Sequence, residues 1–475
     1  MNSVELETIT PAYPSVLSKR HDVDTTNAFA PPPSSFENGS DEASVPVQQG
    51  VPPMTLHDPP RNMWRTVACI LWGFSLGFSD AAPGALLPHI ETYYNINYAV
   101  VSMIWVANAV GFIVVALLAH TIEPLLGRQK SLLLSCVLNI VMYALVSSGT
   151  AFPVIAVGFF FGGLGAGLGV AQTNVFLSRM ELKARLLSFI HGAYGLGATI
   201  SPIIATSVVN ANVAWHYFYL ILLGLYAVNG INLYLSFQGS DVDLKPWDED
   251  PTSANRIETT THETSSVSLL KTALKNPITW LLSFFIFFYQ GSEVAMAGWI
   301  VTFLLDYRHG DPSTMGYVAS GFWGGLTIGR LALTNLLPKL FGIRRGVLLV
   351  SLLSILFVVL CWVIPSVVAV AVLVCLAGVF VGPNYPLMVA FTTTEGLVPR
   401  KTQVITITIM TAFGSSGGAL FPFIVGLISQ SAGTYVIMPV FISLYGAMVM
   451  LWLMLPNVER TAKHGTPQSL WQRLW

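Results

Sequence analysis

The sequence carries very little charge. Only 10% of its 475 residues are Asp, Glu, Lys or Arg, whereas soluble globular proteins carry about 25%. Such a chain cannot cover a water-facing surface with charged groups, so most soluble classes are excluded. The formal net charge of −1 and the isoelectric point near 6.7 also argue against the basic patch that nucleic-acid binding requires. We therefore expect no nucleic-acid partner.

Cysteine is also scarce, and the patterns of metal and nucleotide sites are missing. The four cysteines lie in apolar runs without CxxC pairs or Cys/His clusters, which argues against disulfides and zinc sites. The nucleotide-binding pattern Gly-x-x-x-x-Gly-Lys-[Ser/Thr] does not occur. We expect no catalytic residue, no metal, no cofactor and no nucleotide, and predict that the protein is not an enzyme.

Long apolar runs fill most of the chain after residue 63. Apolar residues make up 53% of the sequence, and the mean hydropathy is +0.64. Each run is near the ~20 residues that a helix needs to cross a bilayer. The sequence predicts an all-α membrane protein with twelve transmembrane helices, at 66–88, 99–121, 131–148, 152–177, 187–209, 215–237, 277–305, 315–337, 346–364, 366–392, 402–429 and 434–455.

The basic residues predict the orientation. Of the 23 Lys and Arg residues, 21 fall in the two tails and in alternate loops. Only Arg308 lies in an opposite loop, and Arg330 lies within a span. Because basic loops stay in the cytosol, we expect both termini to be cytosolic. The plasma membrane is the expected location, with the vacuole or another internal membrane as the alternative.

The chain divides into two halves. The longest interior polar stretch, 238–276, separates six spans from six, and Ala193-Tyr194-Gly195 in span 5 is echoed by Ala412-Phe413-Gly414 in span 11. Parallel repeats of this kind are a known transporter design. We predict two pseudo-symmetric six-helix bundles with the following boundaries: a disordered cytosolic N-terminal tail at 1–63, bundles at 64–237 and 277–455, a cytosolic central loop at 238–276, and a cytosolic C-terminal tail at 456–475.

Three charged residues lie inside the spans. Asp80 and Glu293 are the acids, and Arg330 is the base. A charge at the bilayer centre costs about 2.5–3.5 kcal/mol on insertion scales, and such groups usually mark a pathway. We predict that Asp80 and Glu293 couple transport to protons, and that Arg330 is a gate or salt-bridge residue with Glu395 as a candidate cross-helix partner. The rival account for Glu293 is that Arg330 holds it ionised. A packing role for each is the alternative.

Other features of the span interiors point to a solute path. Pro83-Gly84 follows Asp80 within a turn and predicts a broken helix beside the acid, with a simple packing kink as the alternative. His191 and Tyr194 lie inside span 5. Helix packing is the competing explanation for the residues that we predict to contact the substrate, which are Asn108, Gln172, Asn174, Gln290, Trp299 and Asn384.

The loop between spans 2 and 3 resembles the loop motif of the major facilitator superfamily. The motif reads G-x-L-a-D-r-x-G-r-k, and its end is kept here as Gly127-Arg128-Gln129-Lys130. Pro124 stands where the motif has Asp. The resemblance implies the twelve-helix fold of that superfamily and a gating or salt-bridge role for Arg128.

Three further stretches resemble the fucose-permease-like branch of this superfamily, including its fungal members. They are 289–301, 322–330 and 382–386. In that branch, acids in spans 1 and 4 handle the proton and the sugar. Asp80 matches the first, but Gln172 stands at the second and cannot titrate.

The sequence therefore predicts a secondary active transporter that works by alternating access. Its expected partners are the lipid bilayer, protons and a small polar neutral solute such as a sugar, and we expect a monomer. One alternative is an efflux transporter that exports a secreted natural product. A second is a non-transporting nutrient sensor on a transporter scaffold.

Overall fold

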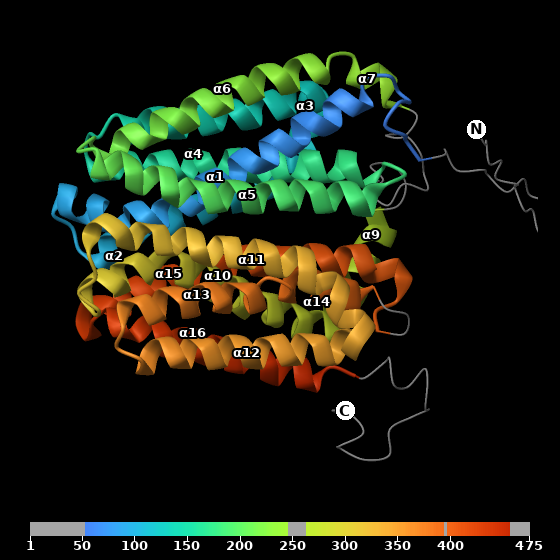
Figure 1. Cartoon of the computed structure of the whole chain (residues 1–475). Coiled ribbons are helices and arrows are strands. Elements are labelled where there is room, and N and C mark those ends of the chain that lie inside the picture. The colour runs from blue at the N-terminus through green and yellow to red at the C-terminus, as the bar shows by residue number, and fades with distance from the viewer. Residues whose placement is uncertain (1–52, 246–262, 394–396, 457–475) are drawn as a thin grey trace, which may run out of the picture. The chain divides into compact units, whose positions relative to one another are not determined.

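A computed structural model describes residues 53–245, 263–393 and 397–456 (Figure 1). These residues belong to one compact unit, Gly50–Trp475. The helices of the first half are α1 (Asn62–Tyr94), α2 (Tyr98–Val101), α3 (Met103–Ser147), α4 (Phe152–Ser178), α5 (Lys183–Asn210), η1 (Trp215–Tyr217), α6 (Phe218–Ser236) and α7 (Ser240–Asp243). Those of the second half are α9 (Glu263–Lys275), α10 (Pro277–Asp306), α11 (Pro312–Phe341), α12 (Ile343–Val363), α13 (Val367–Val381), α14 (Asn384–Thr392), α15 (Arg400–Ala432), η2 (Thr434–Val436) and α16 (Ile437–Met454).

The predicted all-α membrane fold is confirmed. Within the described residues, eleven helices are long and apolar enough to cross a membrane. The remaining expected span corresponds to α11, which is 30 residues long. Spans 2 and 3 follow one another in α3 across a break at Gly127, whose φ of 73° is left-handed and suits glycine.

The predicted break after Asp80 is wrong. α1 continues as one helix through Pro83 and Gly84 to Tyr94. Gly84 has a different use, because a Cβ added there would lie 2.2 Å from the Ala297 carbonyl oxygen of α10. The glycine thus lets helices from the two halves touch through their backbones.

Small residues also line the contact between α5 and α11, which lie side by side where the halves meet (Figure 1). A Cβ at Gly195 would lie 2.3 Å from Thr327 Oγ1, and one at Gly316 would lie 2.1 Å from Thr206 Oγ1. Close approach through glycine is a common way to pack membrane helices. At these positions, the two bundles therefore meet with little interdigitation of side chains.

The last part of the predicted disordered tail is packed. Met54 is 1% exposed; its N–H donates to the Arg179 carbonyl at 3.1 Å, and its own carbonyl accepts from the Glu181 N–H at 2.7 Å. The expected tail, 1–63, therefore overruns the part of the chain that packs, because Met54 finds an apolar site on the α4–α5 loop. Residues 1–52 lie outside the described residues.

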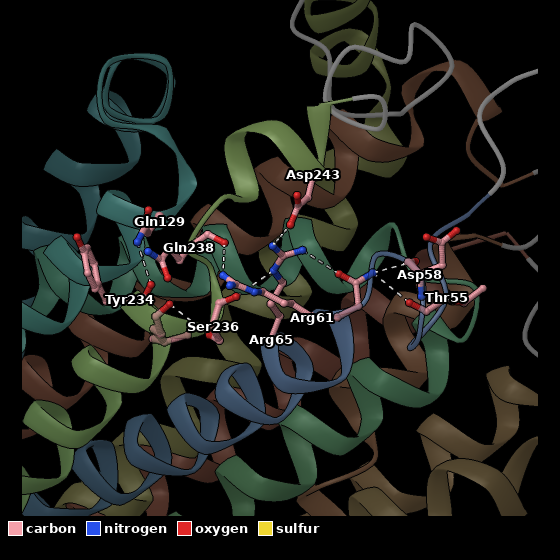
Figure 2. Close-up of polar contacts among 11 residues, drawn as sticks. Thr55, Asp58, Arg61, Arg65, Gln129, Tyr234, Ser236, Gln238 and Asp243 are labelled. Atoms are coloured by element: carbon pink, nitrogen blue, oxygen red, sulfur yellow. Dashed lines mark hydrogen bonds and ion pairs between the residues drawn. The ribbon is translucent and has the colours of Figure 1, made fainter.

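A buried arginine ties the start of α1 to the end of α6 (Figure 2). Arg65 is fully buried. It donates to Asp243 Oδ2 at 2.7 Å, to the Ser236 carbonyl at 3.1 Å and to Asn62 Oδ1 at 3.2 Å. Asn62 in turn donates to the carbonyl of Thr55 at 3.0 Å. The segment before α1, α1 itself and α7 are thus held together on the first bundle.

The other end of the central loop is anchored on the second bundle. α9 packs against α10 and α15, with Ala273 buried. Trp280 of α10 donates its Nε1–H to the Leu274 carbonyl at 2.7 Å. Residues 246–262, which connect the two anchors, lie outside the described residues.

These contacts predict how much of the N-terminus can be removed without a loss of thermal stability. A chain that begins at Gly50 should keep the thermal stability of the full chain, since Met54 and Asn62 keep their partners. A chain that begins at Arg61 should unfold at a lower temperature, because burial of a side chain such as Met54 contributes about 1.5–3 kcal/mol. Thermal unfolding in detergent, followed by size-exclusion chromatography, measures both. Equal losses in the two truncations would contradict the assignment.

Candidate functional site

Asp80 is an accessible charge in the middle of α1. Its side chain is exposed, although Ser79 and Ala82 beside it are buried. Tyr194 of α5 donates its hydroxyl to Asp80 Oδ2 at 3.0 Å. The Tyr194 ring meets Trp323 of α11 edge-on, with ring centroids 6.3 Å apart. Because α11 belongs to the second half, Asp80 lies close to the contact between the bundles.

The close packing of α1 on α5 brings the Tyr194 hydroxyl to this position. A Cβ at Gly77 would lie 1.9 Å from the Tyr194 carbonyl oxygen, and one at Gly197 would lie 2.1 Å from the Phe74 carbonyl oxygen. Both glycines therefore remove side chains that would hold the helices apart. Asp80 follows Gly77 by three residues, so it lies on nearly the same face of α1.

Glu293 and Arg330 form an ion pair in the second half. Arg330 Nη2 lies 3.1 Å from each carboxylate oxygen of Glu293 and 3.3 Å from the Tyr289 hydroxyl, to which it also donates. The Glu293 side chain is 7% exposed and that of Arg330 is 20% exposed. Pairing satisfies two charges that would each be costly alone in the membrane interior.

The break in span 10 supplies a further partner for Arg330. Pro386 has no N–H, so the carbonyl of Gly382 lacks the donor that would bond it in a continuous helix. Arg330 Nε donates to that carbonyl at 3.4 Å. A Cβ at Gly382 would lie 2.3 Å from the Leu326 carbonyl oxygen, so this glycine lets α11 approach the break.

Tyr194 connects the two groups of charges. It donates its hydroxyl to Asp80, and its ring meets Trp323 of α11, the helix that carries Arg330. What we call the central polar cluster is supplied by α1 and α5 from one half and by α10 and α11 from the other, and consists of Asp80, Tyr194, Tyr289, Glu293 and Arg330. The cluster holds one carboxyl that is accessible and one that is paired with a cation.

Known proteins share this architecture. The sequence profile of the Major Facilitator Superfamily matches residues 69–394 and 293–475. The chain belongs to the Major Facilitator Superfamily. Membership makes it a multi-pass membrane transporter rather than an enzyme.

Particular members of the superfamily resemble this chain. It is 28% identical to Bypass of stop codon protein 6 from Saccharomyces cerevisiae over 407 residues. The matched region covers 80% of each chain. Its structure resembles that of the E. coli fucose:proton symporter, with a TM-score of 0.58 and 14% identity over 82% of this chain and 97% of that chain. A D-xylose-proton symporter gives a TM-score of 0.64 at 13% identity over 83% and 98% of the two chains. At such low identities the structures establish only the fold.

The other predicted site residues of this superfamily member fall into two groups. Asn108, Asn174 and Gln290 are partly exposed, and Asn108 Nδ2 donates to the Phe159 carbonyl at 3.4 Å. Gln172 is 2% exposed, and its Oε1 has no hydrogen-bond partner among the described residues. Contact between these side chains and the substrate stays a prediction.

The polar groups of the remaining two residues already have hydrogen-bond partners inside the second bundle. Asn384 is fully buried; its Oδ1 accepts from Ser351 at 3.0 Å, and its Nδ2 donates to the Phe380 carbonyl at 3.0 Å. Trp299 is also buried, with its Nε1–H on the Pro422 carbonyl at 2.9 Å. In this conformation, both residues use their polar groups to hold helices together.

The predicted gate residues are separated in space. Arg128 lies at the α3 break and pairs with Glu123 at 3.1 Å, whereas Arg330 belongs to the central polar cluster. The predicted partner of Arg330, Glu395, lies outside the described residues. The partner that the structure provides is Glu293, the residue named in the rival account.

Sequence reasoning named Tyr289 only as a hydrogen-bonding neighbour of Glu293, and it did not assign Trp323 to the site. Both occur in the stretches that resemble the fucose-permease-like branch. The apolar pattern of a span is the same whether an aromatic residue lines a site or fills the core, so the sequence does not distinguish the two roles. Only the helix contacts place them beside Arg330 and Tyr194.

The ion pair predicts a double-mutant result. Glu293→Gln and Arg330→Gln should each lower the thermal stability, because breaking a buried pair costs about 3–5 kcal/mol. The double variant should lose less than the sum of the two, since neither charge is left alone. Unfolding temperatures of the four proteins in one detergent give the coupling. Additive losses would show that the pair does not stabilise the fold.

Proposed function

We propose that this superfamily member is a proton-coupled symporter of a small, polar, uncharged organic solute of the sugar type, working by alternating access. Asp80 carries the proposal. It is an exposed carboxyl in the middle of a membrane helix, and its partner is the neutral hydroxyl of Tyr194 rather than a cation. Such a carboxyl can exchange its proton with water in the path, whereas Glu293 is held by Arg330.

The charges of the central polar cluster favour a neutral cargo. Glu293 and Arg330 cancel, so the cluster becomes neutral once Asp80 binds a proton. An anionic substrate would want a spare cation there, and Arg330 is already paired. Tyr194 and Trp323 add aromatic rings of the kind that pack against the apolar faces of sugars. The likeness in fold to fucose and xylose proton symporters supports the same substrate class.

We further propose that both termini face the cytosol of a plasma-membrane protein that acts as a monomer. Basic residues lie at the end of the molecule where α1 starts: Arg65 in α1, and Lys271 and Lys275 in α9. Basic residues at one end of the helices favour the cytosolic side. In this orientation, imported protons would enter from the end opposite α7 and α9.

Asp80→Asn tests the proton role. In proteoliposomes with an inward proton gradient, the variant should exchange labelled D-xylose, L-fucose or D-glucose but should accumulate none of them against a gradient. Asn keeps the size and accepts from Tyr194, but it cannot carry a proton. Glu181→Gln, an exposed acid on the α4–α5 loop, is the control and should accumulate sugar normally.

Other results point elsewhere. Normal accumulation by Asp80→Asn would remove Asp80 from the coupling mechanism. Outward net flux in the native protein would favour the efflux alternative. Binding of a sugar without any flux in either direction would favour the sensor.

Glu293→Gln tests the second predicted proton carrier. If Glu293 takes a proton when Arg330 moves away, the variant should exchange sugar without concentrating it, as with Asp80→Asn. Counterflow and gradient-driven uptake measure the two activities separately. Retained pH-driven accumulation would leave Glu293 with a structural role alone, and loss of both activities would indicate a role in folding or substrate binding.

A further inference from the structure

The two halves are joined at the end opposite α7 and α9. One connection runs from α5 to α11, where Asn210 Nδ2 donates to the Ser313 carbonyl at 2.7 Å. A second connection runs from α2, in the first half, to α10 and α15, in the second. Together they close the interface at this end, beyond the central polar cluster.

Tyr98 of α2 binds both helices of the second connection. Its hydroxyl donates to Asp306 at the end of α10, and its backbone N–H donates to Gln430 Oε1 of α15 at 3.0 Å. Asp306 and Gln430 are both exposed. Water can therefore replace Tyr98 as their hydrogen-bond partner when the helices separate, so these bonds can break and form again at a small net cost.

The same tyrosine covers Trp299, which we predicted to contact the substrate. The Tyr98 ring meets the Trp299 ring edge-on, with centroids 5.6 Å apart, and the Trp105 ring lies 5.8 Å from it. Trp299 is itself held in the second bundle by the bond from its Nε1–H to the Pro422 carbonyl. It is fully buried, so withdrawal of Tyr98 and Trp105 would uncover its ring.

Two glycines allow this junction to close. A Cβ added at Gly426 of α15 would lie 2.8 Å from both the Tyr98 carbonyl oxygen and Trp299 Cζ2. A Cβ at Gly298 of α10 would lie 2.5 Å from Trp105 Cζ2. Both distances are shorter than ordinary van der Waals contact. The aromatic residues of the first half can therefore reach the second only because these positions lack side chains.

We propose that Tyr98 is a latch that holds this end of the transport path closed, and that its release uncovers Trp299. The hydrogen bonds to Asp306 and Gln430 fix the position of the tyrosine, and the contact between the rings adds attraction. Because the bonded groups are exposed, the latch opens without leaving a buried polar atom unpaired. Gly426 sets how closely α15 approaches α2 in the closed state.

The inference rests on the alternating access proposed above, but not on the coupling ion or on the identity of the cargo. It also assigns Trp299 a place in the sequence of events. Contact between Trp299 and a substrate is blocked while Tyr98 and Trp105 cover the ring. Cargo that enters from this end would meet Trp299 only after the latch has opened.

The test follows the opening of this end directly. Spin labels that do not react with the native cysteines are placed on the full-length protein at two exposed positions, Val213 in the first half and Val363 in the second. The protein is reconstituted in nanodiscs without sugar. Pulsed electron spin resonance then gives the ratio of short to long label distances, which reports the closed and open states of this end.

Two variants weaken the latch in different ways. Tyr98→Phe keeps the ring and loses the hydroxyl that donates to Asp306, whereas Gly426→Ala adds one methyl group where the helices touch. Each should lower the ratio of short to long distances by about 3–10-fold, the effect expected from the loss of one such contact. The double variant should populate the long distance most.

Two matched variants are the controls. Tyr93→Phe also removes a hydroxyl at this end, but the bond it loses, to the Gly149 carbonyl at 3.2 Å, lies within the first half. Gly446→Ala adds the same methyl group in α16, where no described atom of a neighbouring element lies within 4 Å of the new Cβ. Both controls should stay within about 2-fold of the native ratio.

Several results would overturn the proposal. A native protein that shows the long distance alone would do so, as would a double variant with the native ratio. An equal shift in Tyr93→Phe would show that any hydroxyl at this end has the same effect. Tyr98→Phe keeps the ring contacts, so it folds even if Gly426→Ala does not. Because the measurement uses no cargo and leaves Asp80 intact, failure here is distinct from failure of Asp80→Asn in sugar accumulation.

Discussion

A charge placed inside hydrocarbon must be compensated, and Arg330 shows how this chain meets that constraint. Its guanidinium is satisfied by Glu293 and Tyr289 of α10 and by the carbonyl of Gly382. That carbonyl is open to Arg330 because Pro386 cannot donate to it. The ion pair, the break in span 10 and the glycine contacts of α11 therefore depend on one another. Replacing one of them changes the surroundings of the others.

The two mid-membrane acids differ in environment, although the repeat relates the halves. Asp80 has a neutral partner and accessible surface, whereas Glu293 has a cationic partner and little accessible surface. A pseudo-symmetric fold can thus hold one carboxyl that is free to change its charge and another whose charge organises helix packing. Tyr194 donates to Asp80 and contacts Trp323 of α11, the helix whose Arg330 holds Glu293.

Much of the fold follows from hydropathy, because each span must satisfy its own backbone in lipid. The expected spans needed only composition and length. Hydropathy alone could not decide whether Arg330 pairs with Glu293 or with Glu395, since Glu293 lies 37 residues away on a neighbouring helix and no spacing rule connects them. The break expected at Pro83-Gly84 did not occur, because neighbouring groups can satisfy a helix that contains proline. Local sequence does not reveal that Gly84 serves contact with α10.

The central loop is fixed at both ends but to different bodies. Arg65 holds α7 on the first bundle, and Trp280 holds α9 on the second. Residues 246–262, which join these anchors, lie outside the described residues. The two ends of the central loop therefore belong to different bundles, so any movement of one bundle relative to the other carries the anchors α7 and α9 with it.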